Sequence, residues 1–336
     1  MATKDRIHIS PAELIFTDEQ QTFTQDGSCC TLRRPDGKIE FWTTDLGALP
    51  YYHHFLGTTE NPFAEELEPF TWDYNGYKDT WPCGVWVQNM YNCGDGLFFG
   101  FVHREDIHKT DPGYKNNYHI GFGVSHDGGH HWKYLGDVCS NVCNYQRKYA
   151  NMGGVPFFAG KDGYFYFYFN DFSTDFKPYV TAARLPIKES IEMIRHDELP
   201  LSLVKKYSGN GVWDTDPMTG TAAPMMPEVE GCHFDSHSDS AYCAALDKYL
   251  LIARDGSRLH LLLSDDCAHW EDPILMFAAE PATGYVSYAT IVALDNEASD
   301  DFSTVGHDFY VYFTYKPNGS RDYDYDLYYR CRVTID

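Results

Sequence analysis

One strand-rich unit recurs about five times along the chain, at a spacing of roughly 60 residues. Each copy consists of a short apolar strand, a turn rich in Gly and Asp, an aromatic-rich strand and one or two further strands. Such a period is typical of radial or solenoid arrays, in which every unit packs against its neighbours. Five units of about four strands predict an all-β chain folded as a closed, five-bladed β-propeller.

The repeats predict a single domain over residues 1–336, and helix-like patterns are short. The best helical candidate is Ile187–Arg195, which follows Pro186. The Asp18–Thr24 region, or the segment before it, is expected to add a closing strand to the last blade. The expected blades span approximately residues 24–60, 79–138, 150–215, 235–279 and 285–335.

Two short motifs agree with this architecture. Ser125–Trp132 (SHDGGHHW) resembles the Asp-box of sialidases and related propellers, and Ser264–Trp270 (SDDCAHW) is a degenerate version of it. In such boxes, Asp and Ser side chains cap backbone N–H groups in the turn between outer strands. The motifs therefore indicate a fold and not a chemistry, and His130 and His131 are discounted as metal ligands.

The hairpin from Thr24 to Asp45 carries an aspartate on each strand at its open end. Its turn, Arg34–Gly37, brings the second strand back beside the first, so Asp26 and Asp45 should lie near each other. Paired carboxylates can supply acid/base or nucleophilic chemistry. Alone, the hairpin favours a structural role for both, because Asp is common where strands end. Its place in the first blade of a repeat favours a catalytic pair.

A propeller concentrates function at the face where the innermost strands begin, and the second strand of each blade ends at that same face. Every predicted blade places polar or aromatic residues there. Their types suit a sugar, because Arg and carboxylates bind hydroxyl groups and aromatic faces stack on the apolar side of the ring. The expected substrate-binding residues are Asp79, Trp81, His103, Arg104, Asp171, His237, Asp239, Arg254 and Tyr288, with Glu105 as an alternate acid; the same set of strand ends includes Asn151, Asn170, Asp255, Tyr285, Tyr315 and Lys316.

The chain also resembles a known family. Residues 25–45 (QDGSCCTLRRPDGKIEFWTTD) resemble the first blade of endo-D-arabinanase-like propellers, a family long carried as a domain of unknown function. Residues 81–104, ending in His-Arg, resemble its second blade; residues 239–252 with 261–273 resemble its fourth, and residues 326–333 its closing strand. More broadly, the pattern is similar to the arabinanase and fructosidase glycoside hydrolases.

The resemblance implies a glycoside hydrolase that cleaves a furanoside-type bond with two carboxylates. It assigns Asp26 and Asp45 these roles, one as general acid or acid/base and the other as nucleophile or water-activating base. Burial beside aromatic rings would raise one pKa and keep that carboxyl protonated near neutrality. Thr44 stands where the family usually has Gly, and the loop over residues 51–78 is very long, which leaves the sugar open.

Other functions remain as alternatives. A lectin-like propeller would bind a glycan without turning it over. A sialidase-like exo-glycosidase would need three clustered arginines; Arg104 and Arg254 are well placed, and no clear third appears. A propeller that binds a protein partner on its opposite face would show an exposed apolar patch, for which the sequence has no sign. The oligomeric state is left open.

Charge and hydropathy limit the partners. The formal net charge of −23 disfavours nucleic acid and anionic membrane surfaces, which would both repel the chain. No run approaches the ~18 apolar residues of a membrane-spanning helix. The first 14 residues lack the apolar core of a signal peptide, which fits a cytoplasmic protein as written, or a secreted or periplasmic one with its signal trimmed. The expected partner is an oligo- or polysaccharide.

The two-carboxylate mechanism requires no metal or cofactor. His237 with Asp235 or Asp239 could hold a structural cation on the axis, but a loop histidine satisfied by protein groups is the favoured interpretation. The ten cysteines are scattered, and most are expected to be free thiols; a disulfide between Cys83 and Cys93 is a weaker alternative.

Overall fold

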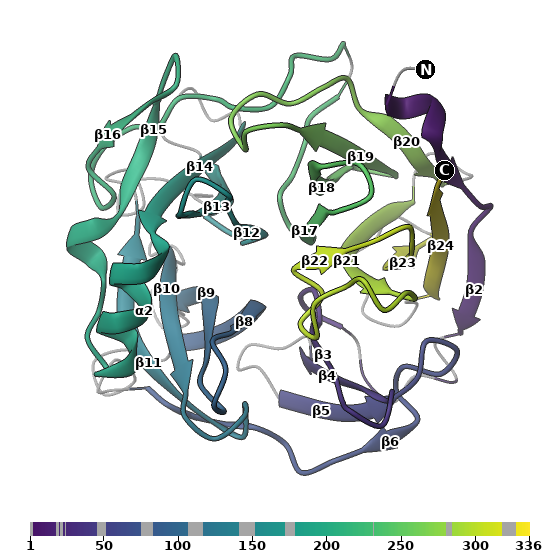
Figure 1. The fold of residues 1–336 in the computed structure, drawn as a ribbon, viewed down its shortest axis with the longest axis horizontal. Helices are drawn as coiled ribbons and strands as arrows, with labels where there is room; N and C mark the ends of the chain where they lie inside the picture. The colour runs from purple at the N-terminus through teal and green to yellow at the C-terminus, as the bar shows by residue number, and fades with distance from the viewer. Residues whose placement is uncertain are drawn as a thin grey trace, which may run out of the picture.

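The structure is a computed structural model, and it describes residues 3–17, 20, 23, 25–45, 52–74, 83–106, 117–140, 152–171, 179–230, 232–279, 284–317 and 327–336. Five sheets stand around a common axis like the blades of a propeller (Figure 1). Consecutive strands within a blade pair antiparallel. The first long strand of each blade lies near the axis, and the later strands lie further out (Figure 1). The chain is therefore an all-β, five-bladed β-propeller, as the repeats predict.

Blades 1 to 3 are built mainly from strands that follow one another in the sequence. Blade 1 consists of β3 (Cys30–Arg33), β4 (Ile39–Thr44), β5 (Tyr52–Gly57) and β6 (Glu65–Glu66). Blade 2 consists of β8 (Cys83–Asn92), β9 (Phe98–Asp106), β10 (Asn117–Ser125) and β11 (His131–Cys139), with β7 (Thr71–Asp73) parallel to β11. Blade 3 consists of β12 (Phe157–Ala159), β13 (Tyr164–Asp171), β14 (Tyr179–Pro186), β15 (Lys205–Gly209) and β16 (Val212–Thr215).

Blades 4 and 5 each include a strand from a distant part of the chain. Blade 4 consists of β17 (Ser240–Cys243), β18 (Lys248–Asp255), β19 (Arg258–Ser264) and β20 (Ile274–Ala278), with β22 (Thr304–Val305) parallel to β17. Blade 5 consists of β21 (Tyr285–Ala293), β23 (Asp308–Lys316) and β24 (Leu327–Ile335), on which the N-terminal strands β1 (Ile7–Ile9) and β2 (Glu13–Phe16) pair. The ring is thus closed by the segment that precedes Asp18, one of the two expected possibilities.

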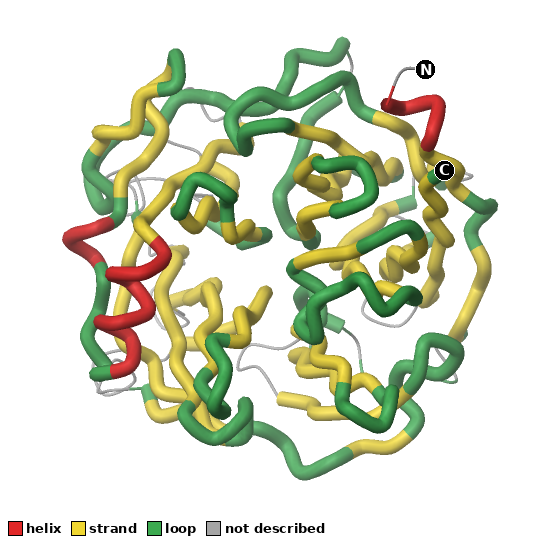
Figure 2. Tube along the Cα trace, viewed as in Figure 1, coloured by secondary structure: helices red, strands yellow, loops and turns green. Residues whose placement is uncertain are grey.

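The predicted helix is present at the predicted place. Figure 2 shows α2 (Ile187–Arg195) on the outside of blade 3, and the described chain also contains short 3₁₀ turns η1 (Thr3–Arg6) and η3 (Leu201–Leu203). Pro186 precedes α2 in an extended conformation, and Ile194 is buried against blade 3. No helix among the described residues is long and apolar enough to cross a membrane.

Both Asp-boxes are capped turns between outer strands. In the first, Ser125 Oγ accepts the Gly129 N–H at 2.9 Å and Asp127 Oδ1 accepts the His131 N–H at 2.9 Å. In the second, Ser264 Oγ accepts the Cys267 N–H at 3.0 Å, and Asp266 Oδ1 accepts the backbone N–H of His269 at 2.8 Å. These side chains satisfy turn donors, which confirms the structural interpretation of the motifs.

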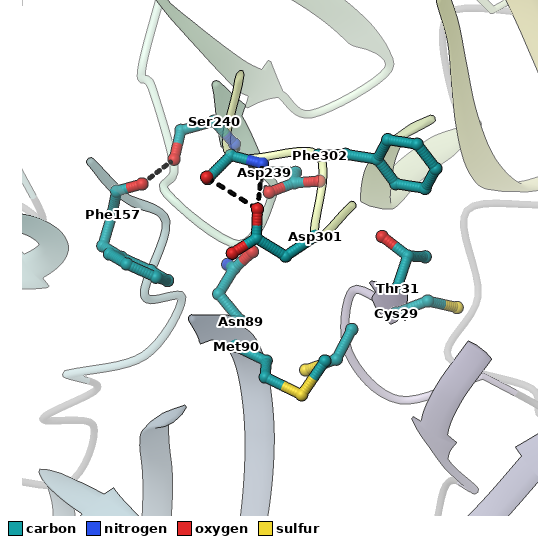
Figure 3. Close-up of a pocket in the computed structure, with 11 residues that line it drawn as sticks. Cys29, Thr31, Asn89, Met90, Phe157, Asp239, Ser240, Asp301 and Phe302 are labelled. Carbon is teal, nitrogen blue, oxygen red and sulfur yellow. Dashed lines mark hydrogen bonds between the residues drawn. The ribbon is translucent and has the colours of Figure 1, made fainter. Parts of the chain in front are cut away.

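The axis is closed at the end opposite to the beginnings of the innermost strands. There, Asp301 Oδ2 accepts the Asn92 N–H of blade 2 at 3.0 Å, and Asp300 O accepts the Arg33 N–H of blade 1 at 2.7 Å. Figure 3 shows a small cavity beside this segment, lined also by Asp239 and by residues in or next to the innermost strands of four blades. The site that the sequence predicts lies at the other end of the axis, where the innermost strands begin.

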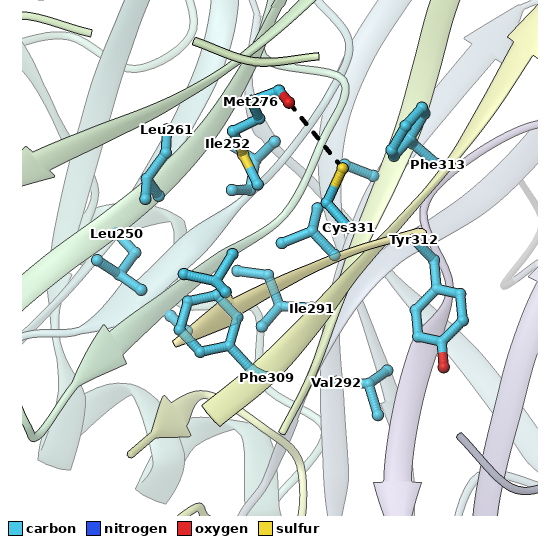
Figure 4. Packing of buried hydrophobic residues seen from close by; sticks show 14 of the residues in the cluster. Leu250, Ile252, Leu261, Met276, Ile291, Val292, Phe309, Tyr312, Phe313 and Cys331 are labelled. Atoms are coloured by element: carbon cyan, nitrogen blue, oxygen red, sulfur yellow. Dashed lines mark hydrogen bonds between the residues drawn. The ribbon is translucent and has the colours of Figure 1, made fainter. Parts of the chain in front are cut away.

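Apolar side chains between blades form the core. Figure 4 shows Leu250, Ile252 and Leu261 of blade 4 in one buried cluster with Phe309 and Cys331 of blade 5. Eight described cysteines, including Cys93, are free thiols, so the possible disulfide between Cys83 and Cys93 is not formed.

Candidate active site

Side chains from all five blades gather at the end of the axis where the innermost strands begin. The innermost strands contribute residues that lie just before them or in their first few positions. The second strand of a blade contributes residues at its C-terminal end. The group consists of Asp26 (blade 1), His103 and Glu105 (blade 2), Asn170 (blade 3), Asp235, His237 and Arg254 (blade 4), and Tyr285 and Tyr288 (blade 5).

Asp26 is held by a tyrosine on the neighbouring blade. The Tyr288 hydroxyl donates a hydrogen bond to Asp26 Oδ1 at 2.8 Å. Tyr288 has a φ of +56°, and it lies where the register of β21 with β23 shifts between Ser287 and Thr290. A positive φ costs free energy for a bulky residue, and such strain concentrates at functional sites. The bulge allows the Tyr288 side chain to reach Asp26 on the neighbouring blade.

The protonation of Asp26 is set by burial and by the groups around it. Burial raises the pKa of the Asp26 carboxyl, the Tyr288 hydrogen bond lowers it, and the Glu105 charge raises it further; His103 and His237 lower it. The net effect is a pKa above the usual value for aspartate. Asp26 therefore keeps its proton to a higher pH than an exposed carboxyl does, which suits a general acid.

Glu105 is the acidic group whose charge acts on Asp26, and a buried histidine holds it. His103 Nε2 lies 2.9 Å from Glu105 Oε1, and the Glu105 side chain is partly exposed. The His103 ring stacks on Tyr118, with ring centroids 5.5 Å apart. Arg104 leaves the other side of β9 and forms a bidentate pair with Asp137 of β11, at 2.8 and 3.0 Å.

A chain of hydrogen bonds fixes the histidine of blade 4. His237 Nδ1 lies 2.6 Å from Asp235 Oδ1, and Arg254 Nη2 donates to Asp235 Oδ2 at 2.7 Å. Burial alone would raise the pKa of Asp235, but the charges of Arg254 and His237 outweigh it and hold that pKa well below its usual range. An ionised carboxylate only accepts hydrogen bonds, so His237 carries a proton on Nδ1 and presents Nε2 to the site.

Two further contacts complete this corner of the site. Arg254 also donates to the Tyr285 hydroxyl, and its guanidinium lies 4.4 Å from the centre of that ring. Asn170 Oδ1 accepts the Ser236 N–H at 3.1 Å, which anchors the segment that carries Asp235 and His237. From the sequence, Asp235 is expected only as a possible cation ligand; its position two residues before His237 is the signal that indicates this pairing.

The backbone of Asp45 lies beside that of Asp26, and the expected site residues Asp171 and Asp239 are buried. Asp45 is paired in the backbone with Gln25, and the Asp26 N–H donates to the carbonyl of its neighbour Thr44 at 2.9 Å. Asp171 is buried at the end of β13. Asp239 lies deeper on the axis, where its carboxylate accepts two backbone N–H groups. Asp79, Trp81 and Asn151 fall outside the described residues.

The residues considered for an axial cation do not fit one in this arrangement. The Arg254 guanidinium is buried against Asp235 and, unlike an exposed arginine, has no room to turn into solvent, so a second positive charge there would be repelled. The two oxygens of Asp239 accept the backbone N–H groups of Ser240 at 2.7 Å and Ile291 at 2.8 Å.

Comparison with known proteins places the fold among glycoside hydrolase propellers. No family model matches the chain, and no curated protein matches its sequence. The chain is similar in structure to a family 117 glycoside hydrolase of Zobellia galactanivorans (11% identity, TM-score 0.55, covering 98% of this chain and 90% of that one). It is also similar to the catalytic domain of the GH62 α-L-arabinofuranosidase of Coprinopsis cinerea (10% identity, TM-score 0.56, covering 98% of this chain and 96% of that one). A third similar structure is a GH43_1 enzyme of Xanthomonas citri (11% identity, TM-score 0.51, covering 96% of this chain and 89% of that one). At these identities the likeness is one of fold.

Proposed function

We propose that this protein is a glycoside hydrolase that cleaves a glycosidic bond with Asp26 and Glu105, at the end of the propeller axis where the innermost strands begin. The observation that carries the proposal is a buried Asp26 with a raised pKa, on which the charge of a second carboxylate acts. Beside this pair, His237 Nε2 can accept a hydrogen bond from a sugar hydroxyl group, and Arg254 supplies guanidinium donors. The likeness of the fold to glycoside hydrolase propellers supports the same reaction class.

In the proposed reaction, protonated Asp26 is the general acid. Tyr288 holds Oδ1 by its hydrogen bond, which leaves Oδ2 to deliver the proton to the leaving glycosidic oxygen. Glu105, positioned by His103, stabilises positive charge at the anomeric carbon and either attacks it or activates a water. A carboxyl separation of about 5 Å would give retention of configuration, and roughly 6.5–9.5 Å would give inversion.

Asp45 is the alternative partner for Asp26, as the family resemblance implies. Its backbone lies opposite Gln25 and not opposite Asp26. Glu105 has a direct electrostatic effect on Asp26, which favours it as the second carboxylate.

The substrate we propose is a furanoside-containing oligo- or polysaccharide. One of the similar structures is an α-L-arabinofuranosidase, which supports this choice. The test is a screen over arabinans, fructans and pyranose polysaccharides, with products identified by chromatography and their anomeric configuration by NMR. Hydrolysis of a furanoside polymer is the expected result. Specific glycan binding without any product would instead establish a lectin-like propeller.

Replacing Tyr288 by Phe should change the pH dependence of this activity. The Tyr288 hydrogen bond lowers the pKa of Asp26, so its removal should raise that pKa further. Because the acid form of Asp26 is the active one, the alkaline limb of the kcat/KM profile should move to higher pH. Tyr310→Phe, in the same blade, is the control and should leave the profile unchanged. An alkaline limb that stays in place in Tyr288→Phe would contradict the role of Asp26 as the acid.

A further inference from the structure

A second group of possible metal ligands lies in blade 4, apart from the carboxylate pair. Cys232 precedes β17, Asp255 ends β18 and His260 lies within β19. One ligand atom from each residue lies within 4.8 Å of the other two. The group therefore brings a thiol, a carboxylate and an imidazole together from three separate segments.

His260 shows that the protein alone does not satisfy this group. The residue is 5% exposed, and neither of its ring nitrogens has a hydrogen-bond partner among the described residues. Phe234 covers the ring edge-on, with centroids 5.5 Å apart. A buried polar atom without a partner costs roughly 1–3 kcal/mol, so each such atom calls for an explanation. A bound metal would use the lone pair of one nitrogen.

Arg258 occupies the space beside the other two ligands. Its guanidinium donates to Asp255 Oδ2 and lies 3.6 Å from the Cys232 sulfur. The Arg258 side chain is 38% exposed, so it can turn into solvent when another cation takes its place. Asp255 Oδ1 accepts the His233 N–H at 3.0 Å, which orients the carboxylate and ties it to the segment that carries Cys232.

We propose that Cys232, Asp255 and His260 form a zinc site that fastens residues 232–237 to blade 4. Sulfur, nitrogen and oxygen ligands together suit Zn²⁺, which is bound by Cys, His and carboxylate side chains in a tetrahedral arrangement. Zinc–ligand bonds of about 2.0–2.3 Å place tetrahedral ligands roughly 3.3–3.8 Å apart. The three side chains need only a small inward movement to reach this spacing, and a water molecule completes the four ligands.

The site stabilises the carbohydrate face indirectly and does not take part in the proposed hydrolysis. Asp255 follows Arg254, and successive side chains on a strand point to opposite sides. Arg254 faces Asp235 and Tyr285, so Asp255 and the zinc lie behind that layer. Because residues 232–237 include Asp235 and His237, zinc would hold both in place.

The test is metal binding by the full-length protein, stripped with EDTA and kept reduced with a phosphine. Titration with Zn²⁺ against a chromophoric chelator should give one ion per chain, and Co²⁺ should produce a sulfur-to-cobalt charge-transfer band. Cys232→Ser should abolish the band and weaken Zn²⁺ binding by roughly tenfold or more. Cys93→Ser, at another partly exposed free cysteine, is the matched control and should bind as the wild type does. Absence of stoichiometric binding, or equal binding by Cys232→Ser, would overturn the proposal.

A second variant tests the competition directly. Arg258→Ala should bind Zn²⁺ more tightly than the wild type, because it removes the cation that occupies the ligands. Arg332→Ala, which removes an exposed arginine paired with Asp308, should leave the affinity unchanged. Both variants change partly exposed side chains, so circular dichroism can verify that they fold. Weaker zinc binding by Arg258→Ala would contradict the assignment of these three ligands.

Discussion

Asp26→Asn and Glu105→Gln should each lower kcat/KM for a polysaccharide substrate by about 10²–10⁴-fold, the range expected for loss of an acid/base group. Both substitutions keep the size of the side chain and remove its ability to exchange a proton or carry a charge. Both variants should still fold. Glu105 is partly exposed, and the amide oxygen that Asp26→Asn introduces can still accept the hydrogen bond from the Tyr288 hydroxyl. Hydrolysis rates and thermal unfolding, measured on the same preparations, check both statements.

The dependence on the leaving group separates the two roles. In an aryl glycoside made from an acidic phenol, the phenolate can leave without help from a proton donor. Asp26→Asn should therefore recover much of its activity on such a substrate, whereas Glu105→Gln should not, because the anomeric carbon still needs its carboxylate. The reverse pattern would exchange the two assignments.

Two aspartates of the first hairpin are the matched controls. Asp36→Asn changes an exposed turn at the opposite end of the hairpin and should leave hydrolysis unchanged. Asp45→Asn should retain most of the activity, because Glu105 is the proposed partner of Asp26. If Asp45→Asn is inactive while Glu105→Gln is active, the second carboxylate is Asp45, as the family resemblance implies.

The architecture was predictable because its causes are local. Each blade contains strands joined by short turns, so alternating apolar residues and Gly/Asp turns repeat within a few tens of residues. The location of the candidate site is predicted from strand direction alone, since an antiparallel second strand must end where the first began. The helix Ile187–Arg195 was also a local signal, set by Pro186 and by one apolar stripe.

Which side chains enter the site was harder to predict, because that depends on register. Arg104 and Glu105 are neighbours, but alternation sends Arg104 to Asp137 and leaves Glu105 beside His103. Tyr288 reaches Asp26 from 262 positions away, through a bulge with a left-handed backbone that no local pattern indicated. Such contacts between blades are set by packing of the whole ring.

The position of Asp239 also depends on packing of the whole ring, and its burial is expected to make the stability of the protein depend strongly on pH. The sequence placed it among the sugar-binding residues, but the structure buries it on the axis between blades 4 and 5. Burial raises the pKa of Asp239 to about 7 in the folded protein, and its hydrogen bonds with the Ile291 and Ser240 N–H groups only partly offset this. The ordinary value for the unfolded chain is 3.8.

Stability should therefore fall as the pH rises from about 4 to 7. In this range the unfolded chain has lost the Asp239 proton while the native protein keeps it, so raising the pH favours unfolding. A difference of about three pKa units corresponds to a loss on the order of 4 kcal/mol, complete once the pH passes 7. Below pH 4, Asp239 is protonated in both states and contributes no pH dependence.

Asp239→Asn isolates this contribution, since an amide cannot ionise. Urea unfolding in EDTA between pH 4 and 8 should show that the variant loses on the order of 4 kcal/mol less than the wild type over the range. The variant starts less stable at pH 4, because its amide NH₂ cannot accept the second backbone N–H group. Asp36→Asn, at an exposed turn, should follow the wild-type curve. Parallel curves for wild type and Asp239→Asn would mean that Asp239 is ionised in the native protein and that a positive group compensates for its burial.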